Sequence, residues 1–385
     1  MIEPAPALAE RSIDCLPPGA LATKLALGRP LRVKLGVDPT APDIHLGHSV
    51  VLGKLREFQD AGHTAVLIIG DWTARVGDPS GRTSTRPMLG EEEIEANAAS
   101  YREQAFRILD PARTEIRPNG EWFATMGMEQ LFALAGSATV NQLLRRNDFA
   151  ARMGADRPIS VLELLYPLMQ AYDSVMVEAD VELGGTDQLF NLMLGREIQT
   201  AFGRPPQVVM TMPILPGVDG VQKMSKSLAN HIGVADRPEE QFGRTMSIPD
   251  AVLAEWFRLL APIAPAPTGH PGEEKRRLAA LIADRFHGAG AGRRAQEHFN
   301  RVVRDRGVPD DMPTLTIDPG LVHLPALLSD GLGIASRGEA RRLIAGGGVS
   351  LDGTPVEALD VASDDLVGRV LRAGKRRFAR LILSD

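Results

Sequence analysis

The sequence predicts an α/β fold with a Rossmann-like parallel sheet, followed by an all-helical domain and a small α+β domain. The first observation is a strand–helix–strand order over residues 31–37, 46–61 and 64–70, which is typical of a parallel βαβ unit. The second is a run of helical patterns separated by Pro and Gly over residues 229–307. The third is two short helical patterns followed by strand patterns after residue 320. A chain of 385 residues is long enough for two or three such domains.

The composition is that of a globular protein with an acidic balance: 44% hydrophobic residues, 24% charged residues and a net charge of −6. Apolar runs such as residues 65–69 are too short to span a bilayer, and the acidic N-terminus lacks the basic start of a secretory signal. Cys15 is the only cysteine, which excludes an internal disulfide and a multi-cysteine zinc site. We therefore expect a cytoplasmic protein with no membrane partner, in which any RNA contact comes from local basic patches.

The turn after the first strand carries Asp38 and Thr40 and leads into the first long helix. His45 and His48 lie at the start of this helix, where free backbone N–H groups and the helix dipole favour an anion. Two imidazoles three residues apart share a face and can donate hydrogen bonds to phosphate oxygens, and Gly47 between them leaves room for a flat ring. Two histidines at this spacing are also found by chance on surfaces and in metal sites.

The turn after the second strand is a Gly–Asp–Pro–Ser–Gly cluster that contains Asp78. Asp78 can supply a carboxylate for a substrate ammonium group, and Arg82 and Arg86 can reach phosphates. Turn formation alone also explains the cluster. A charged amphipathic helix is expected next, over residues 91–109.

The helix predicted at residues 159–172 presents Tyr166, Gln170 and Asp173 on one face, because they are spaced four and three residues apart. These polar groups form either a polar helix edge or one wall of a pocket. On a mostly apolar helix, a pocket is favoured.

A Gly184–Gly185 pair follows the short strand that starts at residue 181, and Asp187 and Gln188 come directly after it. Asp187 can act as the cap of the helix that runs to about residue 202. Because two glycines also permit close approach of a ligand to the backbone, its carboxylate suits a ribose diol as well.

A basic motif, Lys223-Met224-Ser225-Lys226-Ser227, follows the strand predicted at residues 207–211 and a turn-rich segment. Two lysines on a mobile loop can close onto a triphosphate and neutralise charge as pyrophosphate leaves. A single motif of this kind is more often a solvated basic loop.

The rest of the chain is expected to form two further domains. Residues 1–30 suggest a helical leader and a loop. In the helical domain, helices are expected over residues 238–246, 251–260, 273–287 and 293–304. In the last domain, helices over 324–328 and 336–344 precede strands near 349–351, 366–371 and 377–383. Basic residues that suit an RNA backbone, or form a solvated charged face, gather in this last domain: Arg337, Arg341, Arg342, Lys375, Arg376 and Arg377.

The two motifs His45-Leu46-Gly47-His48 and Lys223-Met224-Ser225-Lys226-Ser227, in this order, resemble the paired signatures of class I aminoacyl-tRNA synthetases. Over nearly its whole length the chain is similar to the bacterial tyrosyl-tRNA synthetases. The resemblance to enzymes for tyrosine, and not for another amino acid, depends on three features. They are the Gly77–Gly81 turn, the residues Tyr166, Gln170, Tyr172 and Asp173, and the motif that starts at Gly184.

The resemblance implies a domain order. A catalytic domain would span residues 1–228 with a helical insertion around 111–153, which is either core or the interface of a homodimer. An anticodon-binding helical domain would span 229–307, a linker 308–319, and a ribosomal-protein-like RNA-binding domain 320–385. The implied partners are L-tyrosine, ATP and tRNA(Tyr), with Mg²⁺ accompanying ATP and with no bound organic cofactor or structural metal.

The resemblance also implies residue roles, and this chain departs from the family pattern at Lys34, at Arg82, where a lysine is common, and at Leu46, which replaces an isoleucine. Tyrosine-binding residues would be Asp78, Tyr166 and Gln170 at the ammonium, Gln188 near the carboxylate and Asp173 at the phenol. ATP would be bound by Asp38, Gly47, Gly185, Asp187 and Lys226. Transition-state stabilisation would come from Thr40, His45, His48, Arg82, Arg86, Lys223 and Lys226. Many tyrosyl enzymes place a second phenol contact, a tyrosine, where this chain has Lys34, so Lys34 is expected to hydrogen-bond the phenol oxygen.

Three other functions fit parts of this pattern. A tryptophanyl enzyme shares the fold and the class, but Asp173 suits a phenol. A small-molecule nucleotidyltransferase uses the same histidine motif, but needs neither of the two C-terminal domains. A non-catalytic RNA-binding protein derived from a synthetase would have lost at least one signature, and both are intact here.

Overall fold

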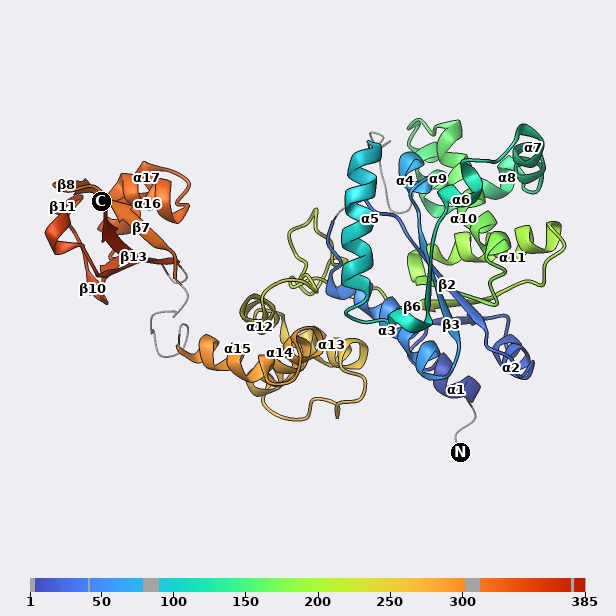
Figure 1. The fold of residues 1–385 in the computed structure, drawn as a ribbon, viewed down its shortest axis with the longest axis horizontal. Helices are drawn as coiled ribbons and strands as arrows, with labels where there is room; N and C mark the ends of the chain where they lie inside the picture. The colour runs from blue at the N-terminus through green and yellow to red at the C-terminus, as the bar shows by residue number, and fades with distance from the viewer. Residues whose placement is uncertain (1–3, 41, 79–89, 302–311, 375–376, 385) are drawn as a thin grey trace. The chain divides into compact units, whose positions relative to one another are not determined.

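The computed structural model describes residues 4–40, 42–78, 90–301, 312–374 and 377–384. The chain divides into two compact units, Met1–Ala289 and Gly290–Asp385, hereafter the N-terminal and C-terminal units (Figure 1). Arg82, Arg86, Lys375 and Arg376 lie outside the described residues.

A six-stranded sheet, in the order β1-β6-β5-β2-β3-β4, forms the centre of the N-terminal unit. Its strands are β1 Asp14–Leu16, β2 Arg32–Val37, β3 Thr64–Ile69, β4 Thr114–Pro118, β5 Val181–Gly185 and β6 Val208–Met212. All neighbours are parallel except β1, which pairs antiparallel with β6. The predicted α/β class and parallel sheet are confirmed, and the strands predicted at 31–37, 64–70 and 207–211 are correct to within one residue.

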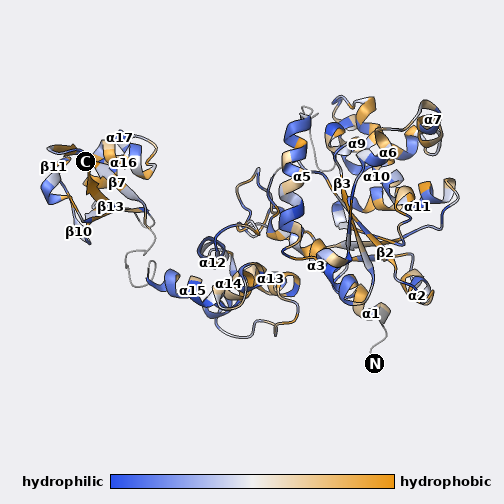
Figure 2. Cartoon of the chain, viewed as in Figure 1, coloured by the Kyte–Doolittle hydropathy of each residue, from blue (hydrophilic) through white to orange (hydrophobic). Residues whose placement is uncertain are grey.

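The two faces of the sheet are covered by different helices, because alternate residues of each strand point to opposite faces. Val33 and Leu35 of β2 share a core with Phe58 of α3 (Leu46–Asp60) and Tyr101 of α5 (Glu91–Ala105). On the other face, Val66 and Ile68 of β3 pack with α10 (Val161–Met176) and α11 (Leu189–Ala201). Figure 1 shows these two helices on the opposite side of the sheet from α5. In Figure 2 the inner strands of the sheet are coloured largely as apolar, whereas α5 is coloured largely as hydrophilic.

The segment 111–153 differs from the prediction, because it begins with a strand of the main sheet. β4 pairs in parallel with β3 and forms the sheet edge, so the helical insertion starts only after Pro118. All five residues of β4 are half-buried and three are polar, so the strand has no apolar run to reveal it. The helices of this region are α6 Gly120–Phe123, α7 Met128–Gly136, α8 Val140–Leu143 and α9 Asn147–Gly154.

The remaining helices of the N-terminal unit are short or belong to its helical region. They are α1 Pro4–Ala9, α2 Ala20–Leu25, α4 Thr73–Val76, α12 Pro238–Met246, α13 Leu253–Leu260 and α14 Pro271–His287. Trp256 of α13 and Leu278 of α14 are fully buried in the same apolar cluster as Phe58 of α3. The helical region therefore shares a core with one face of the sheet.

The C-terminal unit contains a five-stranded sheet in the order β10-β9-β12-β13-β7 and a two-stranded β11–β8 pair. Its elements are α15 Ala291–Phe299, β7 Thr314–Ile317, β8 Leu321–His323, α16 Leu324–Leu332, α17 Arg337–Ala345, β9 Val349–Leu351, β10 Thr354–Pro355, β11 Asp360–Ala362, β12 Val370–Ala373 and β13 Arg377–Leu383. Leu324, Ile344 and Leu381 lie at the centre of its core.

Two predictions for the C-terminal unit are wrong in detail. Residues 314–317 were expected in a linker, but they form β7, which pairs in parallel with β13. Their Thr-Leu-Thr-Ile alternation is a strand pattern that stands between prolines. The strand expected at 366–371 begins only at Val370, because a 3₁₀ turn over Ser363–Asp365 and a second turn, closed by the Arg369 N–H to Leu366 O bond with Gly368 at φ +77°, precede it.

Candidate active site

A cavity of about 670 Å³ lies at the carboxyl ends of β2, β3 and β5, where parallel α/β sheets bind ligands. It brings together most of the residues that the sequence singled out. Those that line it are Asp38, Thr40, His45, Gly47, His48, Asp78, Tyr166, Gln170, Asp173, Gly185, Asp187, Gln188, Lys223 and Lys226.

Two glycines form the floor of this cavity. In the register of β2 and β5, Lys34 pairs with Glu182 and Leu35 with Leu183, so Gly36 and Gly184 lie opposite each other one step further on. A Cβ on Gly36 would meet no atom within 4 Å, although the strand is central to the sheet. The missing side chain of Gly36 therefore leaves a flat surface on which a planar ring can lie. A Cβ on Gly184 would instead come within 3.1 Å of Gln188 Cβ and Leu192 Cδ1, so glycine there lets these residues pack closely against the strand.

The two histidines cap the N-terminus of α3. Nδ1 of His45 accepts the Gly47 N–H at 3.1 Å, and Nδ1 of His48 accepts the His45 N–H at 3.2 Å. The rings stack with centroids 3.9 Å apart. Burial lowers the pKa of His45 to about 2, helped by His48, and burial next to Lys223 lowers the pKa of His48 to about 4. Both rings are therefore neutral near pH 7, and each Nε2–H remains a donor.

Asp38 joins β2 to α10 at the rim of the cavity. Its carboxylate accepts the Tyr166 hydroxyl at 2.9 Å and the Thr73 hydroxyl at 2.7 Å. Burial, with Asp38 nearby, raises the pKa of Tyr166 well above its usual value, so the phenol stays protonated. A Cβ on Gly70 would lie 2.1 Å from Asp38 Oδ1, so only glycine fits beside this carboxylate.

A cluster of amides and one carboxylate forms a second wall. Gln188 Nε2 donates to Asp78 Oδ2 at 2.9 Å, and Asn191 Nδ2 donates to Gln170 Oε1 at 2.8 Å and to Gln188 Oε1 at 3.1 Å. Arg146 lies 3.6 Å from Asp78 and donates to Asn191 Oδ1 at 2.9 Å. The acceptor oxygens of this network suit a cation that carries several N–H donors.

Asp173 is the only buried carboxylate among the residues that line the cavity, in the part of the chain that the structure describes. Trp122 Nε1 donates to Oδ1 at 3.0 Å, and Asn119 Nδ2 lies 3.4 Å from Oδ2. Burial raises the pKa of Asp173 to about 7, although Lys34, Asn119 and Trp122 oppose the shift. The group is therefore partly ionised at neutral pH.

The segment Lys223–Ser227, hereafter the lysine loop, lines the cavity on the side of the histidines. Lys223 Nζ lies 2.6 Å from Asp187 Oδ2, and Lys226 forms an ion pair with Asp43. Between the lysines, Met224 is buried against the core, which anchors the loop. Asp187 does not cap α11, because the N-cap position of that helix is Gln188, whose side chain makes no cap hydrogen bond.

Comparison with known proteins supports one family. The profile of the tRNA synthetases class I (W and Y) matches residues 26–304. The tyrosine–tRNA ligase of Moorella thermoacetica is 50% identical over 372 residues, which cover 94% of this chain and 90% of that protein. The tyrosine–tRNA ligase of Thermotoga maritima is 49% identical over 380 residues, covering 96% and 94%. The chain belongs to the tyrosyl-tRNA synthetase family.

The fold is also that of solved members of the family. The tyrosyl-tRNA synthetase of Archaeoglobus fulgidus, solved with L-tyrosine, superposes with a TM-score of 0.61 at 23% identity, covering 75% of this chain and 97% of that one. The enzyme of Aeropyrum pernix gives a TM-score of 0.61 at 21% identity, with 75% and 96% covered.

Lys34 is one predicted tyrosyl-synthetase residue that the structure does not bring to the cavity. Its side chain is fully buried below the floor, and Nζ is bonded to Gln170 O at 2.8 Å, Ser174 Oγ at 2.9 Å and Glu182 Oε1 at 2.8 Å. An ammonium has three N–H donors, and all three are used here. The expected contact between Lys34 and a phenol is therefore absent from this arrangement.

The predicted RNA-binding residues belong to the C-terminal unit, not to the cavity. Arg337, Arg341 and Arg342 are exposed on α17, and Arg377 is exposed at the start of β13. Arg337 forms an exposed ion pair with Asp330 at 3.3 Å.

Five residues that support the cavity were missed by the sequence analysis: Thr73, Asn119, Trp122, Arg146 and Asn191. Asn191 follows Gln188 by three residues on the same helix, which is the spacing that placed Gln170 and Asp173 together. The other four stand alone in short elements, with no pattern that links them to the cavity.

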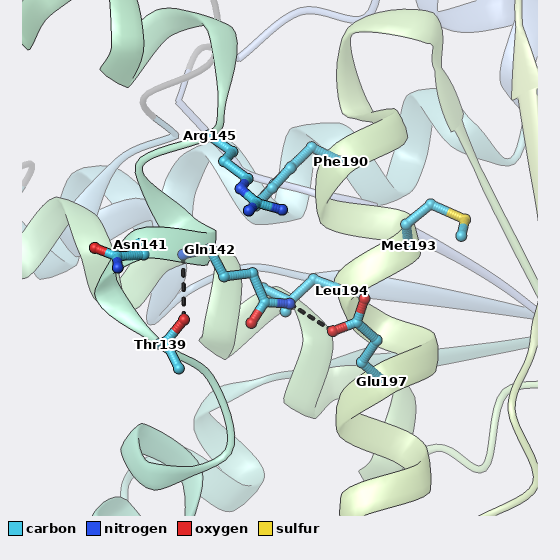
Figure 3. Close-up of a pocket in the computed structure, with 8 residues that line it drawn as sticks. All are labelled: Thr139, Asn141, Gln142, Arg145, Phe190, Met193, Leu194 and Glu197. Atoms are coloured by element: carbon cyan, nitrogen blue, oxygen red, sulfur yellow. Dashed lines mark hydrogen bonds between the residues drawn. The ribbon is translucent and has the colours of Figure 1, made fainter.

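A second cavity of about 510 Å³ lies between α11 and the segment around α8 (Figure 3). Thr139 caps α8 by accepting the Gln142 N–H at 3.2 Å, and Gln142 donates to Glu197 across the cavity. It contains none of the predicted site residues. In the described part of the chain, no group of three or more His, Cys, Asp or Glu is placed to hold a metal, and no helix is long and apolar enough to cross a bilayer.

Proposed function

We propose that this protein activates L-tyrosine with ATP and transfers it to the 3′ end of tRNA(Tyr). The observation that carries the proposal is the position of Asp173, a buried carboxylate in the same cavity as the amide cluster and the histidine pair. A tyrosine on the glycine floor places its phenol at Asp173 and its ammonium at Asp78, Gln170 and Tyr166. The names of the curated relatives support the same reaction.

In the activation step, the tyrosine carboxylate attacks the α-phosphorus of ATP, and the bond to pyrophosphate breaks. His45 and His48 hold neutral Nε2–H donors at the start of α3, with Thr40 on the same rim of the cavity. Lys223 and Lys226 supply positive charge from the loop as pyrophosphate leaves, together with Arg82 and Arg86. Asp187 and Gly185 hold the ribose, and Gly47 lies against adenine. No covalent enzyme intermediate is needed, because positioning and charge stabilisation are sufficient.

The first prediction tests the amino acid. ATP–pyrophosphate exchange, measured with each of the twenty amino acids, is expected to depend on L-tyrosine and on ATP with Mg²⁺ as its substrate complex. The reason is the buried carboxylate that faces the phenol end. Exchange that depends on tryptophan would show that the enzyme is a tryptophanyl one. Exchange that needs no amino acid would contradict both the tyrosyl and the tryptophanyl assignments.

The second prediction concerns the C-terminal unit. A chain ending at Arg301 is expected to keep tyrosine activation but to charge tRNA poorly, because Arg337, Arg341, Arg342 and Arg377 are exposed cations of an acidic protein. The cut falls before β7, since ending the chain at Asp318 would leave that strand without its partner β13. Full-length protein should bind tRNA more weakly as salt rises, and truncation should flatten this dependence. Equal aminoacylation by both proteins across tRNA concentrations would assign another role to this unit.

The third prediction concerns a homodimer, with the insertion as its interface. Met128, Phe132, Val140 and Met153 have exposed fractions of 62%, 66%, 58% and 55%, and Figure 2 shows apolar segments on α7. Light scattering is expected to give twice the 41.5 kDa of one chain, and Phe132→Asp to shift the protein toward monomer. Ile263→Asp, at a side chain 99% exposed in the helical region, is the matched control and should stay dimeric. A monomeric wild type would remove the interface from the proposal.

The proposed enzyme acts in the cytoplasm, where a single unpaired Cys15 is compatible with a reducing environment.

A further inference from the structure

A buried polar cluster lies directly beneath the proposed tyrosine site. Its members are Lys34 of β2, Glu182 of β5, Ser174 of α10 and Gln207, and each is at most 1% exposed. Lys34 and Glu182 are paired residues in the register of neighbouring strands, and their charged groups lie 2.8 Å apart. Glu182 also accepts the Ser174 hydroxyl at 3.2 Å and a hydrogen bond from Gln207. Every charge in this cluster therefore has a partner.

The cluster is linked to the helix that carries the substrate-facing groups. Lys34 Nζ donates to the Gln170 carbonyl at 2.8 Å and to Ser174 Oγ at 2.9 Å. These two α10 residues lie on either side of Asp173 in the sequence, and Gln170 also lines the cavity. One lysine therefore ties the turn of α10 that carries Asp173 to the centre of the sheet.

We infer that the buried Lys34–Glu182 pair is the positioning element for Asp173, setting its place and its charge, and that it thereby controls recognition of the tyrosine hydroxyl. Lys34 acts through Asp173 and makes no contact with substrate. This inference rests on the proposed function, since it assigns the phenol to Asp173. Lys34 supplies a fixed positive charge on the buried side of the Asp173 carboxylate. It does not supply a hydrogen bond to the tyrosine hydroxyl on the cavity side.

Lys34 and Glu182 are expected to have opposite effects on the pKa of Asp173. Lys34 favours the ionised form of Asp173, and Glu182 disfavours it. The other groups facing Asp173 are Asn119 and Trp122, which donate to it, and the Tyr166 hydroxyl, which stays neutral. Removing the charge of Lys34 should therefore raise the pKa of Asp173, and removing the charge of Glu182 should lower it.

The test compares Lys34→Gln with Glu182→Gln in the full-length protein, by measuring the dissociation constants of tyrosine and phenylalanine from pH 5.5 to 8.5. At pH 6, Lys34→Gln should bind tyrosine roughly tenfold more weakly than wild type, and Glu182→Gln roughly threefold more tightly, because one pKa unit corresponds to a tenfold change. At pH 8.5 both should approach wild type. Phenylalanine, which lacks the hydroxyl, should show neither shift.

Glu115→Gln is the matched control, because it breaks a half-exposed ion pair between Glu115 of β4 and Arg32 of β2, the strand that carries Lys34, and should leave the pH profile unchanged. Shifts of the same sign in the two cluster variants, or equal shifts for phenylalanine, would show that the pair only stabilises the fold and overturn the inference. If Lys34→Gln does not fold, Glu182→Gln is a sufficient test by itself. The inference is then overturned if Glu182→Gln does not bind tyrosine more tightly than wild type at pH 6. A wild type that binds no tyrosine overturns the proposed function instead.

Discussion

Asp173→Asn is expected to remove most of the preference for tyrosine over phenylalanine. The substitution keeps the shape of the side chain but removes the charged acceptor that lies 3.0 Å from Trp122 Nε1 and faces the cavity. A hydrogen bond to a charged group is worth about 1.5–3 kcal/mol, so kcat/KM for tyrosine should fall roughly 10- to 150-fold, with little change for phenylalanine. Exchange kinetics with both amino acids measure the ratio directly.

The same residue is expected to make both the stability of the wild type and its use of tyrosine depend on pH. The pKa of Asp173 is raised to about 7, above its value in an unfolded chain, so protonation stabilises the fold and this stabilisation is lost as pH rises from about 4 through 7. Tyrosine recognition is expected to follow the opposite course, because the ionised form is the stronger acceptor. We expect kcat/KM for tyrosine to rise between pH 6 and 8, and the rise to be absent in Asp173→Asn. The same rise in both proteins would assign the titration to another group.

Lys226→Ala is expected to slow adenylate formation by roughly 10²- to 10³-fold, which is typical of removing one charge-stabilising donor from a transition state. Tyrosine affinity should stay within about twofold of wild type, because an interaction made only in the transition state does not contribute to ground-state binding. The structural basis is a lysine that lines the cavity from an exposed loop and pairs there with Asp43. Single-turnover formation of the adenylate separates the chemical step from binding.

Lys275→Ala is the matched control for this experiment. Lys275 also forms an ion pair with a largely exposed aspartate, Asp250 at 2.5 Å, but it is not among the residues that line the cavity. Its substitution should leave the single-turnover rate unchanged. A Lys226→Ala rate equal to that of wild type would remove this lysine from the mechanism.

The sequence predicted the buried strands and missed the edge strands. Fully buried strands such as β3 and β6 appear as continuous apolar runs, so their positions were found to within a residue. β1 and β4 lie at the two sheet edges and are half-buried throughout, so they carry no such run. β7 pairs with a strand more than sixty residues away, and no local pattern specifies that partner.

The site was predicted where residues share one short motif and missed where distant elements meet. His45 with His48, and Gln170 with Asp173, are close because helix geometry brings residues three apart onto one face. Trp122 and Asn119 reach Asp173 from the insertion, across more than fifty residues. Lys34 was expected at the phenol because many tyrosyl enzymes have a phenol-contacting tyrosine at this position, whereas in the structure its ammonium pairs with Glu182 beneath the floor. A buried charge needs a partner, and the sequence did not show which carboxylate that would be.

The two ion pairs of the lysine loop have a consequence for ATP affinity. Lys223 is paired with Asp187 and Lys226 with Asp43, so both lysines can contact a phosphate only in the fraction of molecules in which both pairs are broken. Apparent affinity is the intrinsic affinity multiplied by the competent fraction. All four side chains are at least 29% exposed, so dissolved ions screen these pairs and enlarge that fraction. We therefore expect nucleotide affinity to depend partly on Asp43, a residue assigned no contact with the nucleotide, and partly on the salt concentration around it.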